Sequence, residues 1–142
     1  MSLLRNLPIS VKKSIEKNSL LKVIAGLSNF DKALVSSIAK AASFGGADLL
    51  DIACDPELVA LVRQNCDIPI CVSAVEPKLF LPAIEAGASM IEIGNFDSFY
   101  LQGRIFDADE VISLTQQTRR LLPDVTMSVT VPHTLPLHQQ SQ

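Results

Sequence analysis

Two carboxylates stand at equivalent points of an internal repeat, and they are the first candidates for chemistry. The segment Gly46–Ala53 (GADLLDIA) matches Gly87–Gly94 (GASMIEIG), which aligns Asp51 with Glu92. Each carboxylate is flanked by apolar residues in a run typical of a strand buried on both faces. A carboxylate there is costly unless it is paired, hydrogen-bonded or protonated. The functional interpretation is a general acid or base, and the structural one is an internal ion pair with Lys22.

Further polar residues follow the ends of the other expected strands. Ligands of parallel α/β sheets bind at the carboxyl ends of the strands. This rule selects Asn29, Ser73 and Asn95 as substrate-binding candidates, and His133 as a third catalytic candidate beside the two carboxylates. The alternatives are ordinary turn chemistry for the asparagines and a plain loop position for the histidine.

Lys22 has a second interpretation besides ion pairing. Schiff-base chemistry needs a desolvated lysine near a substrate carbonyl. Lys22 begins its strand, which places it far from the expected ligand end.

No metal or cofactor is predicted. Cys54, Cys66 and Cys71 form no C-x-x-C pair, and His133 and His138 are too few and too distant for a zinc site. The cysteines are expected to be buried, reduced thiols. The chain contains neither a dinucleotide-binding nor a Walker glycine motif.

The elements that position these residues alternate between short apolar runs and helical patterns, which is typical of βα units and a parallel sheet. Asp31, Asp55 and Asp107 are expected to cap helices rather than to catalyse, and the long loop 95–106 is expected to be functional. Pro82 must lie in the first turn of its helix or kink it. The expected strands are 22–26, 48–53, 70–75, 89–94 and 126–131, and the expected helices include 8–18, 31–44 and 77–86.

Length and composition exclude several classes of protein. The 142 residues predict one domain, and 48% apolar against 19% charged residues excludes a disordered chain. The net charge of −3 argues against nucleic acid or an anionic membrane as partner. No apolar run approaches the ~20 residues of a membrane span. We expect an N-terminal covering helix in 1–19, a partial barrel in 20–136 and a frayed polar tail in 137–142.

Four runs of the sequence resemble one family. Together they span roughly residues 20–138. The family that they resemble is the Ycf-twenty-three family, which is named after a reading frame shared by plastids and cyanobacteria. The runs are Lys22–Asp31 (KVIAGLSNFD), Ile70–Pro77 (ICVSAVEP), Met90–Tyr100 (MIEIGNFDSFY) and Ser128–His133 (SVTVPH).

The resemblance implies a fold and a compartment. The implied fold is an aldolase-type (β/α)8 TIM barrel, in cytoplasm or plastid stroma. Complete barrels have about 250 residues, so this chain corresponds to an incomplete barrel of about the first five βα units, with outer helices. Residues 88–103 are more loosely similar to the acid-bearing strand of tryptophan synthase α subunits, where a glutamate in the context of Glu92–Gly94 is catalytic.

These observations leave several functions open. The first is lyase- or isomerase-type acid–base chemistry on a small, phosphorylated or unphosphorylated, metabolite, centred on Glu92 with Asp51 and His133 assisting. The alternatives are a non-catalytic binding or assembly protein and an inactive truncated fragment. An open flavodoxin-like sheet is the competing fold.

An incomplete barrel also predicts the physical state of the chain. The strands at 22–26 and 126–131 would each have an unpaired edge. We expect Ile24, Ile52, Val72 and Ile91 or Ile93 to be partly exposed on the open inner face. The isolated chain is therefore expected to self-associate, to bind a complementary half-barrel or to be partly molten.

Overall fold

Five parallel strands form one sheet whose spatial order is also the order of the sequence, β1-β2-β3-β4-β5. The computed structural model describes residues 6–140. This order is that of an incomplete (β/α) barrel, and it excludes the flavodoxin-like alternative, in which the first strand lies between the second and the third. The strands are β1 (Lys22–Ile24), β2 (Leu49–Ala53), β3 (Ile70–Ala74), β4 (Met90–Ile93) and β5 (Met127–Val129), each shorter than predicted.

Three helices begin at the aspartates that the sequence predicted as caps. The Asp31 carboxylate accepts hydrogen bonds from the backbone N–H groups of residues 33 and 34, at 2.9 and 3.0 Å. Asp55 and Asp107 each accept one, at 2.9 and 2.8 Å. The three capping predictions are confirmed. The helices are α1 (Ile9–Glu16), α2 (Lys32–Phe44), α3 (Pro56–Arg63), the 3-10 helix η2 (Pro77–Leu79), α4 (Phe80–Glu85), α5 (Asp97–Tyr100), α6 (Ala108–Leu121) and α7 (Leu137–Gln140).

Three predicted segments differ from the structure. The helix expected over 77–86 is split into η2 and α4, which leaves Pro82 in the first turn of α4. The long loop 95–106 contains the short helix α5. The tail expected to be frayed forms α7 over 137–140, where the side chain of Gln140 donates to the carbonyl of Leu135 at 2.6 Å; residues 141–142 lie outside the described residues.

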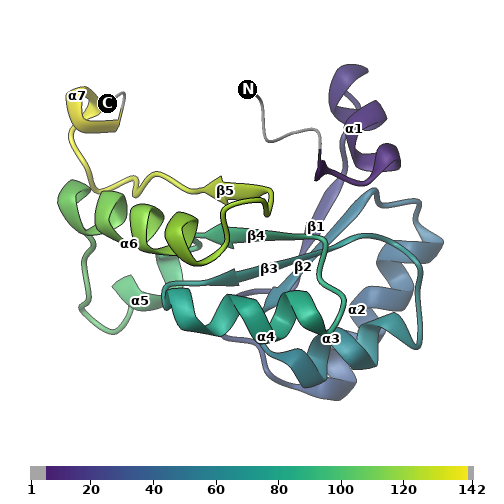
Figure 1. Cartoon of the computed structure of the whole chain (residues 1–142). Coiled ribbons are helices and arrows are strands. Elements are labelled where there is room, and N and C mark those ends of the chain that lie inside the picture. Colours follow the sequence, from purple (N-terminus) through teal and green to yellow (C-terminus); the bar gives the residue numbers. More distant parts are fainter. Residues whose placement is uncertain (1–5, 141–142) are drawn as a thin grey trace.

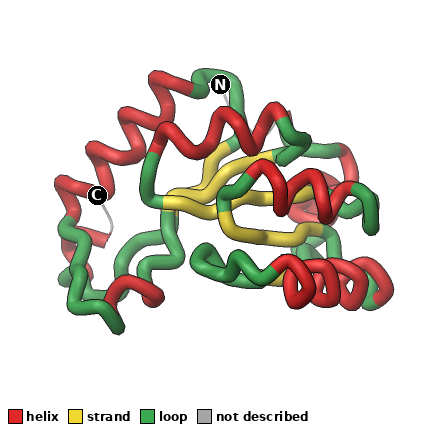
Figure 2. The backbone as a smooth tube through the Cα atoms, turned by 90° about the horizontal axis from the view of Figure 1, so that it is seen from below, coloured by secondary structure: helices red, strands yellow, loops and turns green. Residues whose placement is uncertain are grey.

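Helices cover one face of the sheet. Figure 1 shows α2, α3 and α4 along this face, and Figure 2 shows the same layer from below. Ile52, Val72, Ile91 and Ile93 are buried in the core under these helices, each at most 1% exposed. The expectation that these four residues line the open inner face is therefore wrong. Side chains of a strand alternate between faces, so residues next to an inward carboxylate point outward. Ile24 is exposed as expected, at 55%.

The opposite, inner face is polar toward the strand ends and apolar under α1. Val11 of α1 packs with Leu7, Leu49, Cys71 and Met90 in a separate small cluster. Within the segment 1–19, α1 occupies 9–16, and residues 1–5 lie outside the described part. Within residues 6–140, no helix has both the length and the apolar character needed to cross a bilayer.

Gly94, at the end of β4, is the position where the packing tolerates no side chain. Its φ is +152°, and a Cβ there would lie 2.4 Å from Cβ of Thr130. Gly94→Ala is expected to lower the free energy of unfolding by about 1–3 kcal/mol more than Gly46→Ala, because only the former overpacks a neighbour. Gly46 is the matched control, since its φ is also positive (+76°) but its Cβ would meet nothing within 4 Å. Urea titration measures both, and equal losses would contradict the close approach.

Candidate active site at the strand ends

A lysine bridges the two carboxylates on the inner face of the sheet. Lys22 projects from β1, Asp51 from β2 and Glu92 from β4. Lys22 Nζ lies 2.5 Å from Asp51 Oδ2 and also forms an ion pair with Glu92 Oε2. Asp51 is 1% exposed and Glu92 is 7% exposed. The structural interpretation of the repeat, an internal ion pair with Lys22, is therefore present, and a functional role for either carboxylate has to be compatible with it.

Two hydroxyl groups hold the remaining carboxylate oxygens. Ser73 Oγ donates to Asp51 Oδ1 at 2.5 Å, and Thr130 Oγ1 donates to Glu92 Oε1 at 2.9 Å. Both donors lie beside their acceptors because of the sheet register. Ser73 is two residues after Cys71, which pairs with Asp51, and Thr130 is two residues after Ser128, which pairs with Glu92. Each carboxylate thus has one oxygen on the ammonium and the other on a hydroxyl. This arrangement fixes the orientation of both carboxylates.

The charge state of the bridge follows from burial and from the neighbouring acids. Burial opposes the charged form of Lys22, but Cys71, Asp51 and Glu92 outweigh it and raise the lysine pKa above its ordinary value. Burial raises the pKa of Asp51, against the lowering effects of Lys22 and Ser73. A lysine that stays protonated at neutral pH is a poor nucleophile. The arrangement therefore favours ion pairing over Schiff-base chemistry for Lys22.

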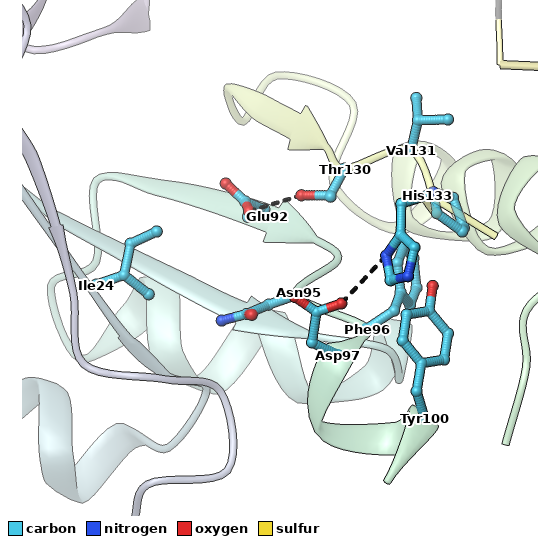
Figure 3. A pocket seen from close by; sticks show the side chains of 10 residues that line it. Ile24, Glu92, Asn95, Phe96, Asp97, Tyr100, Thr130, Val131 and His133 are labelled. Carbon is cyan, nitrogen blue, oxygen red and sulfur yellow. Dashed lines mark hydrogen bonds and ion pairs between the residues drawn. The ribbon is translucent and has the colours of Figure 1, made fainter. Parts of the chain in front are cut away.

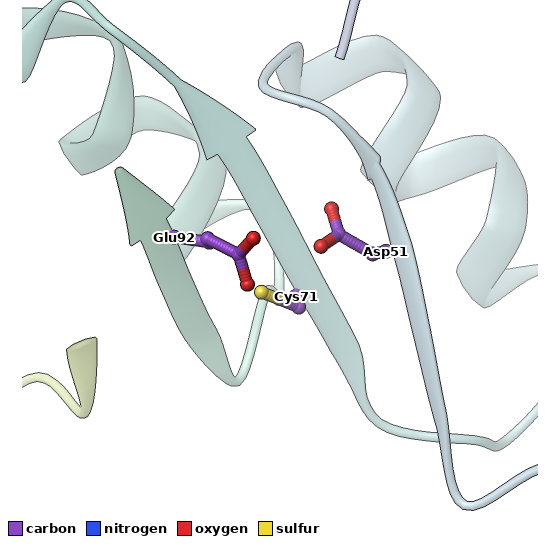
Figure 4. Close-up of side chains that lie close together, drawn as sticks. All are labelled: Asp51, Cys71 and Glu92. Carbon is purple, nitrogen blue, oxygen red and sulfur yellow. The ribbon is translucent and has the colours of Figure 1, made fainter. Parts of the chain in front are cut away.

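Cys71 lies between the two carboxylates, as Figure 4 shows. Three potential ligand atoms lie within 4.8 Å of one another, one each from Asp51, Cys71 and Glu92. Carboxylate oxygen and cysteine sulfur are donor types found in metal sites. Two observations oppose metal binding. The ammonium of Lys22 already lies against both carboxylates. Burial also raises the pKa of the Cys71 thiol well above its ordinary value, which disfavours the thiolate that binds metals.

A cavity of about 310 Å³ opens at the carboxyl ends of β4 and β5. Glu92 is the member of the charged layer that reaches it, and Figure 3 shows the hydrogen bond between its carboxylate and Thr130. The volume suits a small metabolite. The lining consists of Ile24, Glu92, Asn95, Phe96, Asp97, Tyr100, Thr130, Val131, Pro132 and His133.

His133 enters the cavity from the loop after β5 and pairs with α5. Its Nδ1 lies 3.4 Å from Asp97 Oδ1, and both side chains are more than two-thirds exposed. The Tyr100 ring meets the imidazole edge to face, with centroids 5.0 Å apart. The hydroxyl of Tyr100 is buried and has no hydrogen-bond partner among the described residues. The short helix α5 therefore supplies both neighbours of the histidine.

The predicted site residues fall into two groups. Glu92, His133 and Asn95 line the cavity, and Asn95 does so from a left-handed backbone conformation with φ of +64°. Asp51 and Ser73 lie behind Glu92 in the charged layer and do not line the cavity. Asn29 is likewise not a lining residue, and its side chain is bonded to its own turn: its amide donates to the Ala25 carbonyl at 3.1 Å, and its oxygen accepts from the Asp31 N–H at 3.2 Å.

From the sequence, Asp97 and Thr130 were selected only as residues near strand ends, and Tyr100 was considered only as part of a lid or as loop packing; none of the three was given a catalytic or binding role. Asp97 and Tyr100 belong to the run NFDSFY, which looks like an ordinary loop until α5 forms. Thr130 was identified only as a residue near a strand end. The available signal was its position: in a parallel sheet, the residue after β5 lies beside the residues after β4.

Comparisons with known proteins agree with the resemblance found in the sequence. A protein from Cyanophora paradoxa named "Uncharacterized protein ycf23" is 51% identical over 127 residues, covering 89% of this chain and 52% of the relative. Relatives of the same name from Porphyra purpurea and Pyropia yezoensis are 40% and 41% identical, covering 92% and 84% of this chain and 49% and 44% of theirs. The chain thus spans about half the length of the curated relatives it matches.

Among solved structures, a dihydropteroate synthase from Xanthomonas albilineans, in complex with 7,8-dihydropteroate, resembles the chain. The TM-score is 0.47 at 12% identity, over 86% of this chain and 63% of that one. The fold assignment rests on the strand order and register of the chain itself. A family model described as "Protein of unknown function (DUF561)" matches residues 4–142, and the chain belongs to this family.

Proposed function

We propose that the chain provides the acid–base half of a barrel active site that acts on a small polar metabolite, with Glu92 as the proton-transfer group. One observation carries the proposal: the Glu92 carboxylate belongs to a buried, ion-paired charged layer and also lines the cavity at the strand ends. The reaction class is lyase- or isomerase-type proton transfer, in which a carboxylate removes a proton next to a carbonyl group.

The neighbours of Glu92 suit this role. The Thr130 hydroxyl fixes one carboxylate oxygen, and Lys22 compensates the charge on the other. Asp51 keeps Lys22 in place from the far side, so its part is positioning rather than contact with substrate. His133 lies in the same lining and is the second group able to donate or accept a proton.

A second candidate function is assembly without catalysis. It is favoured by the open edges of β1 and β5, since each of these strands pairs with a neighbour on one side within the described sheet. In this alternative the charged layer is structural, and the partner is a polypeptide that completes the barrel. For the compartment we propose the cytoplasm or plastid stroma, because the relatives carry the name of a plastid reading frame.

The substitution Glu92→Gln separates the two candidates. It keeps the shape of the side chain and removes its basicity. We expect exchange of substrate C–H protons with solvent deuterium, followed by NMR across a metabolite panel, to fall by about 10²–10⁴-fold. Glu85→Gln, at an exposed position of α4, is the matched control and should change nothing.

The measurement is made on the 142-residue chain and on the full-length Cyanophora relative carrying the corresponding change. An unchanged exchange rate in the Gln variant would exclude Glu92 as the proton-transfer group. Lower thermal stability together with unchanged partner binding would instead favour the assembly function.

A further inference from the structure

We infer that the cavity at the strand ends selects a small amine rather than a phosphate ester. The inference rests on the proposed function, because it names the substrate class of that same site. The observation behind it is the sign of the charges on the lining. Glu92 and Asp97 contribute carboxylates, and no lysine or arginine of the described chain is among the lining residues.

The nearest ammonium group is not available to an anionic ligand. Lys22 lies behind Glu92 and is shared between two carboxylates. A phosphate that enters the cavity would contact the Glu92 carboxylate first. To pair with the Lys22 ammonium, it would have to displace that carboxylate. Like charges at such short range repel strongly when one of them is largely buried, and Glu92 is 7% exposed.

Asp97 and its neighbours provide the features that an amine needs. The carboxylate of Asp97 is paired with His133 at 3.4 Å, so it can accept a second and closer cation. In Figure 3 the Asp97 and Glu92 carboxylates come from different elements, α5 and β4, and both residues line the same cavity. Ile24, 55% exposed, adds an apolar wall for the body of the ligand.

Tyr100 gives an independent sign that a ligand completes this cavity. Its hydroxyl is buried at the wall and has no hydrogen-bond partner among the described residues. An unpaired buried hydroxyl is uncommon in a folded protein and calls for an explanation. A bound ligand with a polar group would supply the missing hydrogen bond.

The test uses three probes that share one body: butylamine, butanol and butyl phosphate. Backbone-amide NMR shifts of residues 92–100 and of residues 130, 131 and 133 report binding to the 142-residue chain at low ionic strength. We expect butylamine to bind at least about tenfold more tightly than the other two, and added salt to weaken it. Asp97→Asn should weaken amine binding several-fold. The control Asp67→Asn, at an exposed position before β3, should not.

The outcomes separate this inference from the function on which it rests. Tighter binding of butyl phosphate, equal binding of the amine and the alcohol, or an amine affinity unaffected by Asp97→Asn would overturn the amine inference and leave the acid–base site standing. If no probe and no panel metabolite shifts these resonances, both are wrong. If only a metabolite without an amine binds, the inference on substrate class alone fails.

Discussion

Replacing Lys22 by methionine is expected to lower the free energy of unfolding by about 3–5 kcal/mol, as is usual when one partner of a buried ion pair is removed. The substitution keeps the length of the side chain and deletes its charge. Two carboxylates, 1% and 7% exposed, would then face each other without a cation. Urea denaturation at a fixed protein concentration measures the loss.

Lys32→Met is the matched control, because Lys32 also forms a lysine–glutamate ion pair but does so in solvent. Its partner is Glu57 at 2.6 Å, and both side chains are more than half exposed. Exposed pairs of this kind contribute about 0–1 kcal/mol. A large difference between the two variants therefore measures the effect of burial rather than of charge deletion as such.

The pH dependence of the Lys22→Met variant follows from Asp51. Burial already raises the pKa of this carboxyl in the folded protein, and losing the neighbouring ammonium raises it further. A folded-state pKa above the unfolded value gives stability that is present below the unfolded value of 3.8 and lost as pH rises through the folded pKa. The variant should thus recover stability on acidification, and Asp51→Asn in the same background should restore part of the loss at neutral pH. A loss below about 1 kcal/mol, independent of pH, would contradict a buried bridge.

The charged layer was predictable because the internal repeat places its two carboxylates at equivalent strand positions. Aligning Asp51 with Glu92 required only the matching strand entries, and Lys22 was the basic residue at the start of the neighbouring strand. The three aspartate-capped helix starts were predictable for a different reason: an aspartate cap depends on local geometry alone.

What the sequence did not reveal depends on contacts between distant segments. Whether Ile52 or Asp51 faces the helices cannot be decided from a run that is apolar on both sides, and the inner-face assignment of Ile52 was wrong for that reason. The pairing of His133 with Asp97 joins residues 36 positions apart, and it exists because α5 turns the chain back under the end of β5. Periodicity and capping rules use local sequence only, so they do not predict such contacts.

The backbone of the edge strands carries the last prediction, self-association of the isolated chain. On β1, the N–H of Ala25 and the carbonyl of Leu21 bond to β2, so the alternation of a parallel ladder turns the backbone of Lys22 and Ile24 toward the open edge. On β5, the carbonyl of Thr126 and the N–H of Thr130 bond to β4, and Met127 and Val129 are left facing outward in the same way. Unpaired edges of this kind recruit another strand.

We expect the weight-average mass in sedimentation equilibrium to rise with protein concentration, and Ile24→Pro to weaken this association. Proline removes the outward N–H without breaking a hydrogen bond to β2. Because the Ile24 side chain is exposed, its replacement removes few packing contacts. Losing one or two intermolecular hydrogen bonds of about 0.5–1.5 kcal/mol each corresponds to roughly tenfold weaker association.

Phe44→Ser distinguishes pairing through edges from general hydrophobic adhesion. Phe44 is the last residue of α2 and is 98% exposed, far more than Ile24, but it lies in the helix layer and not at a strand edge. If its removal lowers association as much as Ile24→Pro does, apolar surface and not the edge drives assembly. A monomer at all concentrations that unfolds in one sharp transition would mean that the outward backbone groups of Ile24 and Val129 are satisfied by water. The five-stranded sheet would then be stable on its own, because four of the isoleucines and valines expected on its open face are already buried under the helices.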